Sequence, residues 1–161
     1  AVRPVVRGAG HERGIRPGTE NVAGIAGLGE ACAMAMESLD EEANRQRRLR
    51  DSLEARLGQA GFVVHGKGAA RLPNTVNGRF PGVRGSALVE RLRGELAFTT
   101  GSACHAGVEH ASAALLAMGI PAEEALGAIR LSLGRETREE DVERAAELLI
   151  AAAAPEKIVS A

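Results

Sequence analysis

The residue with the clearest capacity to take part in a reaction is a cysteine in a loop of small residues. Cys104 lies between Gly101 and Gly107, ahead of a short predicted helix. A reactive cysteine acts as a thiolate, and it needs exposure and a pliant backbone more than close packing. Free cysteine is also a common small core residue, so the residues alone leave both interpretations open. The other cysteine, Cys32, falls in an Ala-rich predicted helix, and we expect it to pack there.

A second candidate is an arginine in the middle of a predicted strand. Arg130 lies between Ile129 and Leu131, and because strand side chains alternate, it belongs to the face opposite these two aliphatic residues. A guanidinium binds a carboxylate through two parallel hydrogen bonds. That carboxylate belongs either to a ligand or to a structural Asp or Glu of the same domain.

The opening segment is the third candidate. Residues 8–19 combine several glycines with charged side chains, and Thr19 stands ahead of a predicted helix that it can cap. Glycines let backbone N–H groups approach a ligand, and a helix N-terminus favours an anion. A phosphate would suit this segment, and a plain loop is the alternative.

No metal site is expected from the histidines. Cys104, His105 and His110 form a C-H-x₄-H run, which lacks the paired spacing of structural zinc sites. His65, beside a predicted strand end, is interpreted as structural.

The elements that must position these residues read as an α+β arrangement. We expect one helix after Thr19 that runs to about Leu39, and a second that starts near Asp40 and ends at Gly58. Strands and short helices then alternate, which allows strands to pair non-sequentially. The final helix is expected to begin with a Thr137–Glu140 capping box. The predicted strands cover 62–65, 75–80, 96–100 and 128–133, and the helices between them cover 86–93, 112–118 and a segment opened by Pro121.

Bulk composition narrows the function. A net charge of −1 gives no electrostatic case for nucleic-acid binding. We see no apolar run near the roughly 20 residues that span a bilayer, and no signal peptide, so no membrane association is expected. Two distant cysteines fit a reducing compartment, and the expected location is the cytoplasm.

Four segments, taken in order, resemble the motifs of pyridoxal-phosphate (PLP)-dependent cysteine desulfurases. They are GAGHERGIRPGT (8–19), LPNTVNGRFPGVRGSALV (72–89), TTGSACHAG (99–107) and AIRLSLGRETREEDVE (128–143). The resemblance implies the C-terminal part of an aspartate-aminotransferase-type, fold type I PLP enzyme. Residues 1–39 would be the end of the large PLP-binding domain and a connecting helix. Residues 40–161 would be the small domain with the catalytic-cysteine loop.

The resemblance also implies roles for single residues. Cys104 takes the place of the nucleophile that removes sulfur from bound L-cysteine, becomes a persulfide and leaves L-alanine. Arg130 takes the place of the arginine that holds the substrate carboxylate. Thr19 matches the threonine that reaches the PLP phosphate of the partner in a homodimer. The persulfide sulfur would pass to an acceptor, such as an iron–sulfur scaffold protein.

Departures from the family pattern leave alternatives open. The family's cofactor lysine follows a His, whereas Lys67 and Lys157, the two lysines here, do not. The lysine that anchors PLP is therefore expected outside this chain. His105 directly after Cys104 also occurs in selenocysteine lyases, so selenocysteine is an alternative substrate. A non-catalytic remnant, acting as a dimerisation or scaffold-binding module, and a PLP-independent thiol hydrolase are the other interpretations.

Overall fold

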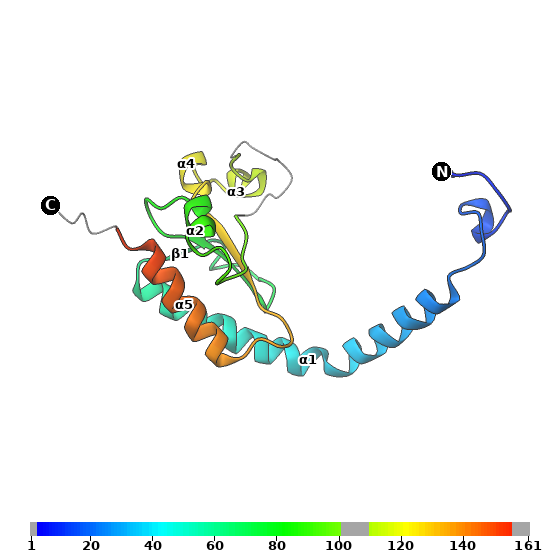
Figure 1. The fold of residues 1–161 in the computed structure, drawn as a ribbon, viewed down its shortest axis with the longest axis horizontal. Helices are drawn as coiled ribbons and strands as arrows, with labels where there is room; N and C mark the ends of the chain where they lie inside the picture. The colour runs from blue at the N-terminus through cyan, green and yellow to red at the C-terminus, as the bar shows by residue number, and fades with distance from the viewer. Residues whose placement is uncertain (1–2, 101–109, 156–161) are drawn as a thin grey trace. The chain divides into compact units, whose positions relative to one another are not determined.

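The structure is a computed structural model that describes residues 3–100 and 110–155 of the chain. The chain divides into two compact units, Ala1–Leu39 and Asp40–Ala161 (Figure 1). The assignment of these units to a large and a small domain stays a prediction. In the first unit, a short 3₁₀ helix η1 (Glu12–Gly14) precedes the start of helix α1.

Helix α1 (Val22–Gln59) is one continuous helix, so the prediction of two helices that meet near Asp40 is wrong. No glycine or proline interrupts residues 30–57, and such residues are what usually break or kink a helix. The predicted cap is also displaced, because Asn21 Oδ1 accepts the Gly24 N–H at 3.0 Å. Gly61, with φ at +85°, lies in the turn that follows the helix.

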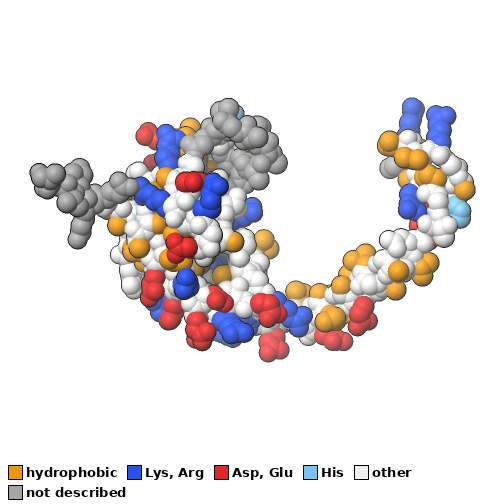
Figure 2. Space-filling view, in the orientation of Figure 1, with side chains coloured by type: hydrophobic (Ala, Val, Ile, Leu, Met, Phe, Trp, Pro, Cys, Tyr) orange, Lys and Arg blue, Asp and Glu red, His pale blue; other side chains and the backbone are white. Residues whose placement is uncertain are grey.

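Large apolar side chains of the first unit are exposed. None of residues 3–39 is buried, and orange side chains line this part of α1 in Figure 2. The expectation that Cys32 packs in a core is wrong for this structure, where Cys32 is exposed. The exposed large apolar residues of this helical segment are Val22, Ile25, Leu28, Met34, Met36 and Leu39.

By length and composition alone, α1 contains an 18-residue stretch apolar enough to cross a membrane, and none of that stretch is buried. The expectation that no apolar run approaches this length is wrong by that criterion. Core helices of soluble proteins and signal sequences meet the same criterion, so the stretch is weak evidence for a membrane span.

The second unit contains a three-stranded antiparallel sheet in the order β1 (Val63–Val64), β2 (Thr75–Arg79) and β3 (Ile129–Ser132). These strands confirm the predictions for 62–65, 75–80 and 128–133. The predicted strand at 96–100 is reduced to one bridge, between Thr99 and Arg130. This bridge places a segment that precedes β3 in sequence beside its free edge, so the pairing is non-sequential there.

The core lies between one face of this sheet and helices α1, α2 (Gly85–Arg91) and α5 (Glu139–Ala153). Val76 and Ile129 are completely buried on that face, and Leu149 of α5 packs in the same cluster. The short helices α3 (Ala113–Ala117) and α4 (Ala122–Ala125) form a separate small cluster. Both follow the predicted segments closely.

The predicted capping box of α5 is wrong by one residue. Asp141 Oδ2 accepts the Arg138 N–H at 2.9 Å, one position further along than Thr137 and Glu140. The Arg138 side chain, which can only donate, makes no capping hydrogen bond in return. Thr137 instead accepts the Gly134 N–H at 2.9 Å through its hydroxyl. Its hydroxyl therefore stabilises the turn after β3 rather than the helix end.

Gly78 provides a test of the sheet's packing. A Cβ built there would overlap Phe62 Cε1 and the Val63 carbonyl oxygen, and would lie 2.8 Å from Phe62 Cζ. We expect Gly78→Ala to lower the free energy of unfolding by about 1–3 kcal/mol, because an overpacked core must shift side chains or backbone. Urea unfolding followed by circular dichroism measures this loss.

The matched control is Gly58→Ala, at a helical site where a Cβ meets nothing within 4 Å. It should leave stability unchanged or raise it by up to about 1 kcal/mol, because alanine favours the helix. Equal effects of the two substitutions would contradict the packing described for Gly78.

Candidate functional site

The polar face of the sheet forms one wall of a pocket of about 460 Å³. Strand β2 contributes Asn77 to this wall, and β3 contributes Arg130. His65, directly after β1, lines the same pocket. Thr100 and Ser112, which lie on either side of residues 101–109, also line it. The pocket therefore adjoins both ends of the segment that carries Cys104.

Cys104 and His105 themselves lie outside the described residues. The role of Cys104 as the nucleophile therefore stays a prediction. His110 is described and exposed. Among residues 3–100 and 110–155, no group of three or more His, Cys, Asp or Glu side chains is placed to hold a metal ion.

Arg130 is exposed on the pocket side of β3, and the pattern of alternating burial predicted for this strand is confirmed. Its backbone exchanges two hydrogen bonds with Thr99, at 2.7 and 3.2 Å. Its guanidinium makes no hydrogen bond or ion pair with any described residue. The structural alternative, a pair with an Asp or Glu of the same domain, is therefore absent from the described part of the chain.

Two further residues of the pocket were not identified as functional from the sequence. Asn77 lies directly opposite Arg130 in the β2–β3 register, and His65 Nδ1 lies 2.7 Å from Asn77 Oδ1. The alternation of β2, with Val76 and Gly78 buried and Asn77 between them, was the available signal. The pairing of His65 with Asn77 required the tertiary structure.

Thr19 belongs to the first unit and is exposed. Its carbonyl oxygen accepts a hydrogen bond from Arg16 Nη1 at 2.8 Å, whereas its hydroxyl has no partner among the described residues. Asn21 caps α1 in its place. The Thr19 hydroxyl therefore remains available as a donor to an external anion such as a phosphate.

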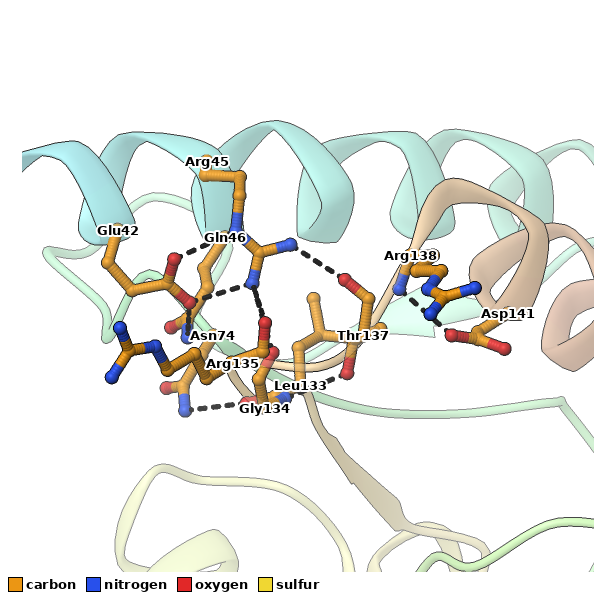
Figure 3. A network of polar contacts seen from close by, with 10 residues as sticks. All are labelled: Glu42, Arg45, Gln46, Asn74, Leu133, Gly134, Arg135, Thr137, Arg138 and Asp141. Atoms are coloured by element: carbon orange, nitrogen blue, oxygen red, sulfur yellow. Dashed lines mark hydrogen bonds and ion pairs between the residues drawn. The ribbon is translucent and has the colours of Figure 1, made fainter.

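A network of hydrogen bonds holds the chain that leaves β3 (Figure 3). Arg45 of α1 donates to three carbonyl oxygens, those of Thr137 at 2.6 Å, Arg135 at 2.8 Å and Gly134 at 3.1 Å. Glu42 fixes the same guanidinium through two bonds of 2.7 and 2.8 Å. The strand that carries the pocket arginine is thus tied to α1 at its end.

The same turn is also tied to the beginning of β2. Asn74 Nδ2 donates to the Leu133 carbonyl at 3.1 Å, and the Leu133 N–H donates to the Asn74 carbonyl at 2.8 Å. Asn74 belongs to the LPNT segment that directly precedes β2. These two bonds hold β2 and β3 in one register next to the pocket.

The comparisons with known proteins agree with this architecture. The model of the class-V aminotransferase family matches residues 7–145. A cysteine desulfurase of Frankia sp. is 45% identical over 150 residues, which is 91% of this chain and 36% of the relative. One of Gluconacetobacter diazotrophicus is 43% identical, over 92% of this chain and 38% of the relative.

Solved structures show the same fold. The X-ray structure of a NifS-like protein from Rickettsia africae matches with a TM-score of 0.81 at 28% identity, over 94% of this chain and 40% of that one. A second NifS-like protein matches with a TM-score of 0.75 at 36% identity, over 92% of this chain and 38% of that one.

The sheet, the flanking helices and these matches define the C-terminal part of a fold type I PLP enzyme. The chain belongs to the class-V aminotransferase family. Its resemblance to cysteine desulfurases, inferred from four motifs, is confirmed by relatives of that name. The chain spans only 36–38% of the length of the two curated relatives described above.

The Glu42–Arg45 pair gives the scaffold a pH dependence. The hydrogen bond that Arg45 donates to Glu42 lowers the pKa of the Glu42 carboxyl from 4.5 to about 2. Because the folded-state pKa is depressed, the stabilisation is complete above the unfolded pKa and is lost as the pH falls toward 2. We expect Glu42→Gln to lose less stability than the wild type between pH 5 and pH 3, measured by urea unfolding.

Glu41→Gln is the matched control, because Glu41 is exposed and has no hydrogen bond or ion pair within the described residues. It should retain the wild-type pH dependence. If Glu42→Gln does so as well, the network of Figure 3 does not stabilise the fold through this carboxylate.

Proposed function

We propose that this chain is the C-terminal part of a cysteine desulfurase and supplies the sulfur-accepting thiol and the arginine that binds the substrate carboxylate. The guanidinium of Arg130 carries the proposal, because it has no partner among the described residues and faces a pocket that adjoins both ends of the Cys104 segment. A guanidinium left without an internal carboxylate is suited to bind one from a ligand. The alpha-carboxylate of L-cysteine is such a group.

The reaction requires a thiolate at Cys104. Only a small part of an unperturbed thiol, with a pKa of about 8.5, is ionised at neutral pH. The Cys104 thiolate attacks the sulfur of bound L-cysteine, so that an S–S bond forms and the C–S bond breaks. The electron pair of the broken bond stays with the carbon, which takes up a proton to give L-alanine. Bound PLP supplies the electron withdrawal that makes this bond cleavable.

One residue of this chain, Thr19, suits one group of PLP, its phosphate. The hydroxyl of Thr19, which has no partner among the described residues, suits the cofactor phosphate, in agreement with its match to the family's phosphate-binding threonine. Lys67 follows Gly66, and Lys157 follows Glu156, so neither fits the His-Lys pattern of the cofactor-anchoring lysine. We propose that the anchoring lysine belongs to another stretch of polypeptide, and that Thr19 serves the partner's cofactor within a homodimer.

The destination of the sulfur is proposed in general terms. The persulfide on Cys104 would pass to the thiol of an acceptor protein, such as an iron–sulfur scaffold. Selenocysteine carries the same carboxylate and would bind the same site. A competition experiment between cysteine and selenocysteine would show whether sulfur or selenium is transferred. The cytoplasmic location and the absence of nucleic-acid and membrane partners stay predictions.

A chimera tests the proposed activity. The C-terminal part of the Frankia cysteine desulfurase, which is 45% identical to this chain, is replaced by residues 1–161. With dithiothreitol present to reduce the Cys104 persulfide, we expect the chimera to release L-alanine and sulfide from L-cysteine. Cys104→Ser should reduce turnover to background, because serine cannot accept the sulfur. Arg130→Ala should lower kcat/KM by about 10–100-fold, as expected for the loss of hydrogen bonds to a charged group.

Arg144→Ala is the matched control, because Arg144 is exposed on α5 and makes no hydrogen bond or ion pair within the described part of the chain. It should retain wild-type kcat/KM. A folded chimera that binds PLP but has no turnover would support the non-catalytic remnant instead. Turnover that survives Cys104→Ser would contradict the proposed nucleophile.

The 161-residue chain alone provides the converse test. Because neither Lys67 nor Lys157 fits the pattern of the anchoring lysine, we expect PLP to leave no visible colour on the chain after gel filtration. We also expect no sulfide to form from L-cysteine, even with dithiothreitol present to reduce any persulfide. Absorbance spectroscopy and a sulfide assay measure these outcomes. Sulfide formation by the isolated chain that is lost in Cys104→Ala would contradict the need for an external lysine.

A further inference from the structure

Asn77 and Arg130 form a close cross-strand pair. The backbone N–H and carbonyl of Arg130 are both engaged by Thr99, on the far side of β3. The carbonyl of Asn77 accepts the His65 N–H at 2.8 Å, on the far side of β2. Asn77 and Arg130 are therefore a non-hydrogen-bonded pair of the antiparallel ladder. Side chains of such pairs point to the same face and lie closest together.

His65 orients the Asn77 carboxamide. The imidazole Nδ1 lies 2.7 Å from Asn77 Oδ1, and because an amide oxygen only accepts, this contact requires the Nδ1–H tautomer or the imidazolium. His65 is only 9% exposed, so its ring is held within the unit. With its oxygen engaged by His65, the Asn77 NH₂ group keeps two donors that have no partner among the described residues.

The charges around the pocket favour an anion. No Asp or Glu is among the described residues that line it. Of its two arginines, Arg71 is neutralised by Glu54, with hydrogen bonds of 2.5 and 3.1 Å. Arg130 has no such partner in the part of the chain that the structure describes. A guanidinium and a carboxamide NH₂, both without a partner in the described part of the chain, thus lie side by side on one wall.

We propose that Asn77 is a second donor for the ligand carboxylate beside Arg130, and that His65 is the positioning residue that aims its NH₂ group. The inference rests on the proposed function and extends it to the chemistry of the carboxylate site. A carboxylate accepts at about four lone-pair positions, so the arginine fork leaves room for another donor. A neutral donor adds directionality without adding a charge that must be desolvated.

The test uses the 161-residue chain and L-alanine, which carries the carboxylate of the product. L-Alaninamide, which lacks the carboxylate, is the matched ligand. In ¹H–¹⁵N NMR titrations we expect L-alanine, but not L-alaninamide, to shift the Asn77 NH₂ and Arg130 Nε–H signals. Asn77→Ala should weaken L-alanine binding by about 10-fold, and Asn77→Asp should weaken it further through charge repulsion.

His65 has its own spectroscopic signature. Long-range ¹H–¹⁵N spectra distinguish the two neutral tautomers, and the wild type should show Nδ1–H at neutral pH. The Asn77→Ala substitution should release the ring from that tautomer. His65→Ala should weaken L-alanine binding by a few-fold, whereas Asn44→Ala, in an exposed part of α1, should leave it unchanged. The dispersion of each spectrum shows whether the variant is folded, and Asn77→Ser replaces Asn77→Ala if that variant is not.

The outcomes separate this inference from the proposed function. If Arg130→Ala abolishes L-alanine binding while Asn77→Ala and Asn77→Ser do not weaken it, the second donor is rejected and the carboxylate-binding arginine stands. If L-alanine and L-alaninamide bind alike, or neither binds, the pocket is not a carboxylate site and the inference is overturned. An Nε2–H tautomer of His65 in the wild type would reject the positioning role alone.

Discussion

The register between β2 and β3 is the constraint on which the rest of the site depends. Val76 pairs with Leu131 and Gly78 with Ile129, and these residues face the core. Because side chains alternate, the same register places Arg130 on the other face. A slip of one residue would turn the guanidinium into the core and expose the aliphatic face. Hydrophobic burial therefore determines where the charged group lies.

The arginines of the second unit differ in the partners that they find. Arg45 satisfies three backbone carbonyls and Glu42, and the buried Arg50 donates to the Leu72 carbonyl at 2.9 Å and to Asp51 at 2.7 Å. Such guanidiniums are already engaged within the fold, and a buried one left without a partner would be costly. Arg130 lacks an internal partner within the described residues, which supports its proposed role toward a ligand.

The first unit differs from the second, because large apolar side chains of its helix are exposed. Side chains such as Leu28, 66% exposed, and Met36, 73% exposed, lie on a helix rich in alanine and glycine. Several exposed large apolar side chains on one helix typically mark an interaction site. With a chain that spans little more than a third of its relatives, this surface supports the proposal that these residues work within a larger PLP enzyme.

The amino-acid sequence by itself determined the family and most elements, and it indicated two candidate site residues. Period-two alternation predicted β2 and β3, and the motifs around Cys104 and Arg130 indicated the chemistry, because both signals are local in the chain. The sequence also predicted a break near Asp40 and a cap at Thr19, and both predictions are wrong. Thr19 and Asn21 are both residue types that cap helices, for example, and only the backbone geometry shows which of them does so.

Only the tertiary structure decided which polar groups are satisfied. His65 and Asn77 are 12 residues apart, and Arg45 lies 89–92 residues from the carbonyls that it binds. No local pattern predicts such contacts, because they follow from strand register and helix packing across the whole unit. The sequence therefore identified Arg130 as a candidate, and the fold showed that its guanidinium lies beside Asn77 with no partner among the residues that the structure describes.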